Sequence, residues 1–211
     1  LEDKSQEDLD LELALVDGFM INEKDDMLRD ISENLCLGGR HDDAIRVVQQ
    51  MIDDFHRNDA LGSIVAAYME QGKMDQAMVT ADSIQNDIIG FGVYRDLAMK
   101  CKELGWRRNA VEMVMKADAF AERVDQGIVR DFYFRELTDL LLTQDLFDQA
   151  IDAVVKIENT ASKSLAMGKI VQGLSRAEKF DTALEYAVGI EEPEQRKDAL
   201  FEVASLAAEK G

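Results

Sequence analysis

The stretch Leu61–Ile84, LGSIVAAYMEQGKMDQAMVTADSI, contains one complete copy of the structural unit from which the chain is built. Leu61, Ile64 and Tyr68 follow the i, i+3, i+7 spacing that places side chains on one face of a helix. A break follows at Gly72, and glycine readily adopts the left-handed conformation that ends many helices. A second apolar pattern with helical spacing then runs to the end of the stretch. The stretch therefore predicts a helix, a tight turn and a second helix.

The same pattern recurs along the chain. An alanine lies near the start of each predicted second helix, and these repeat alanines are Ala44, Ala77, Ala110, Ala150 and Ala183, spaced by 33, 33, 40 and 33 residues. The predicted first helices open their apolar faces at Leu28, Leu61, Tyr94, Phe134, Met167 and Leu200. The turns fall at Gly39, Gly72, Gly105, Asp145 and Glu178. A fixed period of this size is typical of stacked helical repeats.

We therefore predict an all-α fold, a right-handed α-solenoid of antiparallel helix pairs with about five hairpins plus terminal half-units. The expected repeat domain covers residues 24–211, in units of about 24–56, 57–89, 90–129, 130–162 and 163–195 with a final helix at 196–211. Residues 1–23 are expected to hold a charged segment and a partial preceding helix, at Leu11–Met20. The final helix is either a polar cap or the first half of an interrupted hairpin.

One unit is longer than the others. Between Ala110 and Ala150 there are seven extra residues, which fall within Asp118–Phe132 and correspond to about two helical turns. Two explanations remain open: a longer second helix after Ala110, or an added turn near Gly127.

From Lys24 to Gly211 the chain resembles the tetratricopeptide repeat family. The turn glycines, the small residue that opens each second helix and Tyr68 late in a first helix carry this resemblance. The chain departs from the family pattern because no tryptophan opens a first helix, and because Pro193 is its only proline. The resemblance implies a concave groove lined by first helices, in which a peptide or helix of a partner protein binds.

Several bases and methionines fall in or beside the columns that should face this groove. The candidate binding residues are Arg95, Met99, Lys102, Arg135, Lys169 and Arg176. Methionine adapts to irregular apolar surfaces and arginine binds carboxylates with two parallel hydrogen bonds. The groove is thus expected to bind an acidic, partly apolar segment. Alternatively, acids on the same face neutralise the bases: Asp96, Glu103, Glu136 and Asp139.

The net charge of −19, from 43 acids and 24 bases, argues against nucleic acid and anionic membrane surfaces as partners. It either keeps an extended surface soluble or attracts basic partners. Cys36 and Cys101 lie in separate units, and neither they nor His41 and His56 have the spacing of a metal site. We expect no cofactor, metal, catalytic residue or membrane insertion, and a reducing compartment such as the cytoplasm.

The sequence thus favours a non-enzymatic protein–protein interaction scaffold. Two other functions remain open, a secretion-type tetratricopeptide chaperone for client proteins and a structural arm of a larger multidomain protein.

Overall fold

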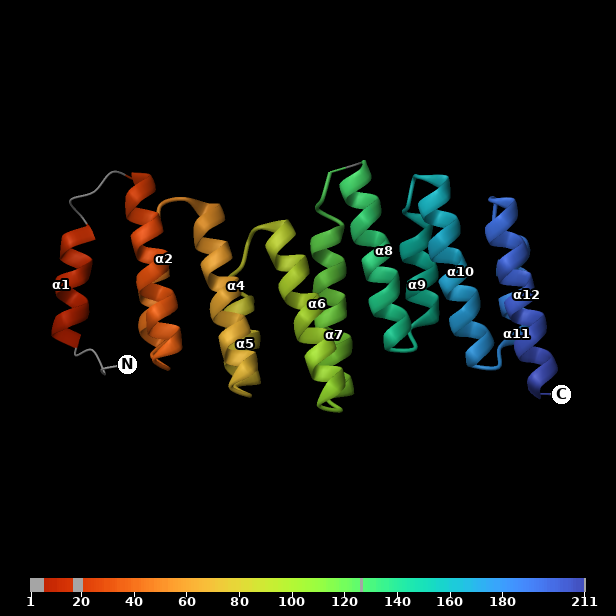
Figure 1. Cartoon of the computed structure of the whole chain (residues 1–211), viewed down its shortest axis with the longest axis horizontal. Coiled ribbons are helices and arrows are strands. Elements are labelled where there is room, and N and C mark those ends of the chain that lie inside the picture. Colours follow the sequence, from red (N-terminus) through yellow and green to blue (C-terminus); the bar gives the residue numbers. More distant parts are fainter. Residues whose placement is uncertain (1–5, 17–20, 126, 211) are drawn as a thin grey trace. The chain divides into compact units, whose positions relative to one another are not determined.

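The computed structural model describes residues 6–16, 21–125 and 127–210, and every regular element in these ranges is an α-helix (Figure 1). The helices are α1 (Gln6–Val16), α2 (Ile21–Leu37), α3 (His41–Val48), α4 (Asp54–Glu70), α5 (Met74–Ala81) and α6 (Asp87–Glu103). They continue as α7 (Arg107–Ala121), α8 (Ile128–Thr143), α9 (Phe147–Val155), α10 (Thr160–Arg176), α11 (Phe180–Val188) and α12 (Pro193–Lys210). The predicted all-α fold built from helical hairpins is confirmed.

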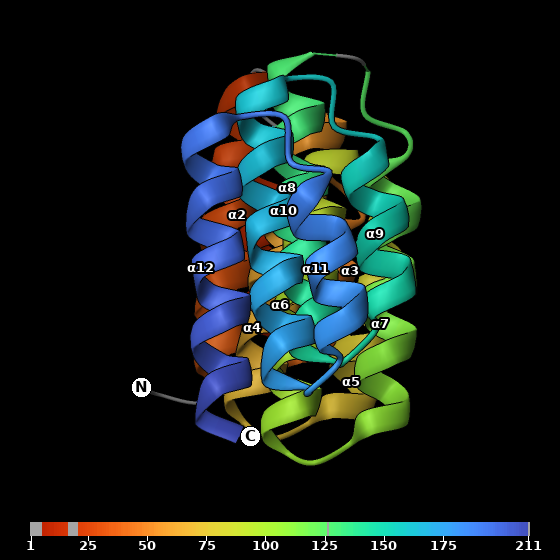
Figure 2. The ribbon, with the colours of Figure 1, turned by 90° about the vertical axis from the view of Figure 1, so that its right-hand side faces the viewer.

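The chain divides within α6, between Leu97 and Ala98, into two compact units. The first unit contains α1, the hairpins α2–α3 and α4–α5, and most of α6. The second contains the end of α6, then α7, the hairpins α8–α9 and α10–α11, and α12. Within the second unit α8, α10 and α12 form one layer and α7, α9 and α11 form another (Figure 2). Likewise, α2 and α4 lie opposite α3 and α5 in the first unit (Figure 2).

The hairpin turns share one backbone geometry. Each predicted turn residue has a positive φ: 77° at Gly39, 71° at Gly72, 75° at Gly105, and 60° at both Asp145 and Glu178. The next residue donates its N–H to a carbonyl five residues back, as Lys73 N does to Tyr68 O at 2.9 Å. This is the Schellman arrangement, which satisfies carbonyls that the end of a helix leaves free. The predicted positions of the hairpin turns are confirmed, including Asp145 and Glu178, where the residue is not glycine.

The repeat alanines are completely buried, each with a relative exposure of 0%. A methyl group is the whole side chain at these positions, so the backbones of neighbouring helices can approach closely there. The first apolar residues Leu28, Tyr94 and Phe134 are buried as well. Together these columns form the core between the two layers of helices.

A buried polar side chain ties each of several first helices to a later loop. Asp131 accepts hydrogen bonds from the backbone N–H groups of Glu158 (2.8 Å) and Asn159 (2.9 Å). Asp25 and Asn58 bind two N–H groups each in the same way, and Ser164 Oγ accepts one from Glu192 at 3.4 Å. We call these four residues the loop clamps. They satisfy N–H groups at the entrance to the next first helix, which would otherwise be costly to bury.

The seven extra residues extend the second helix of their unit. Helix α7 has 15 residues, whereas α3 and α5 have 8 each and α9 and α11 have 9 each. Phe120 on the added length is buried, and the Arg123 guanidinium lies 4.0 Å from its ring centroid. The extra residues therefore form a longer second helix after Ala110, and not an added turn near Gly127.

The N-terminal helix starts earlier than the sequence pattern suggested. Helix α1 begins at Gln6, not at Leu11, and buries Leu9 and Val16. The end of the predicted helix, residues 17–20, lies outside the described residues.

Candidate functional site

Two adjoining hollows open on the first-helix face of the second unit. One, of about 520 Å³, lies among α8, α10 and α12, and the other, of about 480 Å³, lies between α8 and α10 near their C-terminal ends. Lys169 and Gln172 line both hollows. We treat the two adjoining hollows as one candidate site and call it the α10 groove.

The floor of the α10 groove is apolar and depends on two glycines of α10. Leu165 is 49% exposed and lines the larger hollow, and Leu142 and Phe147 line the smaller one. A Cβ at Gly168 would meet nothing within 4 Å, so the missing side chain leaves room for a ligand. A Cβ at Gly173 would lie 3.1 Å from the Phe147 ring, so this glycine lets the ring pack against α10.

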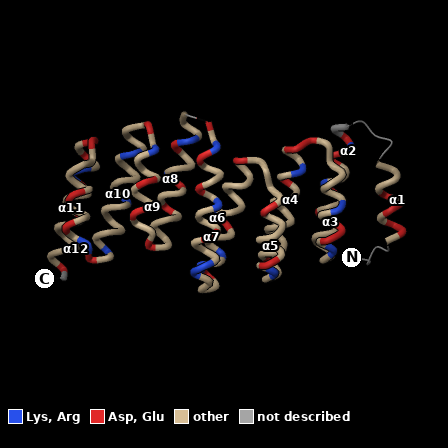
Figure 3. The backbone as a smooth tube through the Cα atoms, turned by 180° about the vertical axis from the view of Figure 1, so that it is seen from behind, with Lys and Arg blue, Asp and Glu red and all other residues tan. Residues whose placement is uncertain are grey.

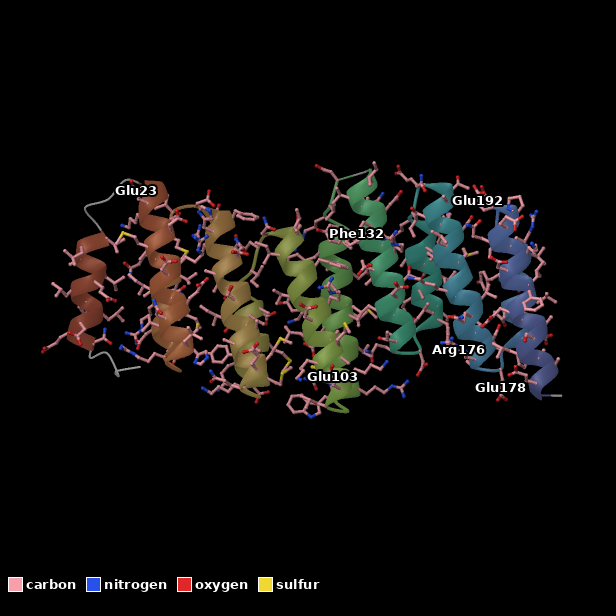
Figure 4. The ribbon with its side chains drawn as sticks, in the orientation of Figure 1. Glu23, Glu103, Phe132, Arg176, Glu178 and Glu192 are labelled. Atoms are coloured by element: carbon pink, nitrogen blue, oxygen red, sulfur yellow. The ribbon has the colours of Figure 1, made fainter. Side chains whose placement is uncertain are left out.

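Three of the six predicted binding residues line the α10 groove: Arg135, Lys169 and Arg176. Lys169 is ion-paired with Asp139 of α8. Arg135 stacks over Phe132, with its guanidinium 5.3 Å from the ring centroid, and Arg176 is exposed at the end of α10 (Figure 4). Among the described residues Arg135 and Arg176 form no ion pair, so their guanidinium groups remain available to a ligand.

The other three predicted residues do not join this group. Arg95 belongs to the first unit, where its Nε lies 2.9 Å from Asp96 Oδ1. Met99 and Lys102 lie in the part of α6 that belongs to the second unit, and both are exposed. Neither lines the two hollows of the α10 groove.

Acids and bases are mixed over the helices of both units (Figure 3). The acids that line the α10 groove are Glu136, Asp139, Asp145, Asp198 and Glu202. Asp139 pairs with Lys169, and Glu202 accepts a hydrogen bond from Gln172 at 3.2 Å. Acids therefore neutralise two of the candidate bases, as the sequence allowed: Lys169 in the groove and Arg95 in the first unit. The groove is of mixed charge, and among the described residues its arginines Arg135 and Arg176 form no ion pair.

Sequence reasoning missed the residues that shape the site. Leu165, Gly168 and Gln172 were not candidates, although all three lie on the predicted first helix of the fifth unit. The loop clamps were missed as well, although each stands three residues before a first apolar residue. The sequence does show this set of polar residues, since Asp25, Asn58, Asp131 and Ser164 repeat at the same spacing as the repeat alanines.

A smaller polar hollow of about 290 Å³ lies in the first unit, at the start of α3. His41 is the buried first residue of α3 and stacks on Tyr68 at 4.3 Å between ring centroids. Asp43 bridges Arg40 (2.6 Å) and Arg46 (2.5 Å) across this hollow. These charges serve the protein's own packing, so the α10 groove is the stronger candidate site.

Within the described ranges, no set of three or more His, Cys, Asp or Glu side chains is placed to hold a metal ion. Across the same ranges, no helix combines the length and apolar composition needed to cross a bilayer. Cys36 and Cys101 are both buried.

No protein-family model matches the chain, and no curated protein does so either. Among solved structures it is similar to Ton1535 from Thermococcus onnurineus NA1, with 15% identity and a TM-score of 0.49 over 95% of this chain and 74% of that one. It is also similar to a kinesin light chain from Podosopora anserina with nearly identical TPR-like repeats, with 11% identity and a TM-score of 0.43 over 87% and 94% of the two chains.

A third similar structure is the signal transduction ATPase with a tetratricopeptide repeat sensor from Pyrococcus horikoshii, with 12% identity and a TM-score of 0.40. The match covers 95% of this chain and 33% of that one. At such identities the likeness concerns the fold alone. The chain's own hairpins form an array of helical repeats whose fold resembles that of tetratricopeptide repeats.

Proposed function

We propose that this protein is a non-enzymatic interaction scaffold that binds a segment of a partner protein in the α10 groove of its second unit. The observation that carries the proposal is the pair of adjoining hollows along α10, which have apolar residues in their lining and the guanidinium groups of Arg135 and Arg176, without an ion pair among the described residues, at their edges. Arrays of helical hairpins commonly bind partners on surfaces of this kind.

The groove also indicates the chemistry of the segment. Leu165 and Leu142 lie in separate hollows, so two apolar side chains of the ligand have places to pack. Each guanidinium matches a carboxylate in a bidentate geometry. The acids of the groove disfavour a uniformly acidic ligand. We therefore expect a segment with apolar residues between two carboxylates, and with polar or basic residues opposite Asp198 and Glu202.

The test begins with peptides selected from a random display library on the whole chain. Selected peptides should show the predicted pattern of two acids that flank apolar residues. In the double variant Arg135→Glu, Arg176→Glu their affinity should fall about tenfold or more, because each reversal places like charges together. Added salt should weaken binding to the parent protein, since exposed charge contacts are screened.

The matched control is Arg107→Glu, Arg108→Glu. These two arginines are also exposed in the second unit, but they open α7 and do not line the hollows. The control should leave the affinity unchanged. Equal effects of both double variants, with helical circular dichroism intact, would mean that binding follows total charge and not the groove.

A further inference from the structure

The second helices of the second unit carry a repeated surface pattern that the α10 groove does not use. The pattern has an apolar residue one position after each repeat alanine, an acid two positions after it, and an apolar residue five positions after it. Its members are Val111, Glu112 and Met115 on α7, Ile151, Asp152 and Val155 on α9, and Leu184, Glu185 and Val188 on α11. We call these nine residues the outer stripe.

Four of the six apolar members of the outer stripe are exposed to solvent, and the other two, Val111 and Ile151, are half-buried. Val155 is 66% exposed and Val188 is 59% exposed, and Met115 and Leu184 are exposed as well. On each helix the two apolar residues are four positions apart and therefore share a face. Valine is a poor helix former and contributes no burial at such a position, so folding alone does not account for it.

The stripe is not a property of the repeat itself. In the first unit, the positions five residues after the repeat alanine hold Gln49 on the C-cap of α3 and Asp82 on the C-cap of α5. Two residues after the alanine stand Arg46 and Val79, where the second unit has an acid each time. The acid and apolar columns therefore coincide only on the second helices of the second unit.

The outer stripe lies on the layer of α7, α9 and α11, opposite the layer that forms the α10 groove (Figure 2). Its first two helices meet where Lys156, at the end of α9, pairs with Asp118 (3.7 Å) and Glu122 of α7. Burial raises the pKa of Asp118, Lys156 opposes this rise, and the charges of Glu122 and Asp152 add to it. The stripe thus lies in a locally acidic surface.

We propose that the outer stripe docks a basic amphipathic helix of a partner protein. The apolar side chains of the stripe match an apolar face of a partner helix, and the exposed acids Asp152 and Glu185 match Lys or Arg beside that face. Glu112, the third acid, lies 4.0 Å from Lys116 Nζ on its own helix. The stripe crosses three successive second helices, so a docked helix must repeat its apolar residues along one face. A helix with apolar residues at heptad spacing would therefore reach α7, α9 and α11 in succession.

Charge excludes the other occupants of such a surface. A second copy of this chain, docked through the same stripe, would set acid against acid. Anionic lipid and nucleic acid would be repelled for the same reason. A basic helix is the occupant that the acid column and the net charge of −19 both favour.

The probe is a synthetic helix of about 21 residues with Leu at heptad a and d positions and Lys or Arg beside them. It should bind the whole chain, whereas the same peptide with Glu in place of each base should not. Val155→Gln, Val188→Gln should weaken binding about tenfold or more, since these two valines are the most exposed apolar residues of the stripe. Asp152→Lys, Glu185→Lys should weaken it similarly and reduce its dependence on salt.

The matched controls are Val79→Gln and Asp75→Lys on α5 of the first unit, where Val79 is 71% exposed. Both should leave the affinity unchanged, as should the groove variant Arg135→Glu, Arg176→Glu, which separates this proposal from the proposed function. An unchanged affinity in the stripe variants, with circular dichroism intact, would overturn the proposal. So would equal binding of the acidic peptide, or concentration-dependent dimerisation by light scattering that Val155→Gln, Val188→Gln abolishes.

Discussion

At the scale of single residues, the repeat alanines and the turn residues show how much of this fold can be read from the sequence. A period of 33 residues identified both columns, because burial and positive φ restrict the amino acid at one position in every unit. Gln172 and Gly168 could not be recognised in this way, because their role depends on the helices that happen to surround them.

Because Ala150 is completely buried, a bulky side chain at this position should destabilise the fold. Ala150→Phe should lower the free energy of unfolding by roughly 1–3 kcal/mol, because the ring would force neighbouring helices apart. Ala119→Phe, at an exposed position of the second helix α7, should have little effect. Urea unfolding followed by circular dichroism measures both, and equal midpoints for the two variants would contradict the close packing at Ala150.

The two cysteines should be unreactive in the folded protein. Burial, and after it the charge of Glu33, raises the pKa of the Cys36 thiol to about 11. At pH 8 only about one such thiol in a thousand is therefore the reactive thiolate. Burial raises the pKa of Cys101 as well, with a further contribution from Glu112. A thiol reagent at pH 8 should label both residues only after denaturation, and rapid labelling of native protein would contradict this packing.

At the scale of helices and loops, the sequence predicted the hairpins but not what fastens one hairpin to the next. The column of loop clamps repeats in the register of the alanines, but the backbone N–H groups that Asp131 binds, 27 and 28 residues ahead, cannot be recognised from residue types. The longer helix α7 was one of two alternatives, because the length of an insertion does not determine its conformation. The unit with this longer helix has Phe91 where a loop clamp would stand.

The loop clamps predict an order of stability among variants of Asp131. Asp131→Ala leaves the N–H groups of Glu158 and Asn159 without their acceptor and should cost about 1–3 kcal/mol. Asp131→Asn should cost less, because the single Oδ1 of Asn58 accepts both bonds at the equivalent position. Urea denaturation of the two variants measures the difference. If Ala and Asn are equally tolerated, the clamp does not contribute to stability.

At the scale of the whole molecule, the second unit has two chemically different faces. The α10 groove combines apolar residues with the arginines Arg135 and Arg176, whereas the outer stripe combines apolar residues with acids. The repeat spacing of the first helices predicted from the sequence that Arg135, Lys169 and Arg176 lie on the groove face. It could not show that Lys169 is neutralised by Asp139, because that contact joins α8 to α10 through side-chain geometry.

The central claim is that an acidic–apolar segment binds along α10, and methyl NMR of the whole chain tests it most directly. A selected peptide is titrated into protein with labelled Leu and Val methyl groups. The account predicts that the methyl signals of Leu165 and Leu142, which line the two hollows, shift with peptide concentration. The signals of Val155 and Val188 on the opposite layer should stay in place. Shifts confined to Val155 and Val188, with Leu165 and Leu142 unchanged, would contradict the claim.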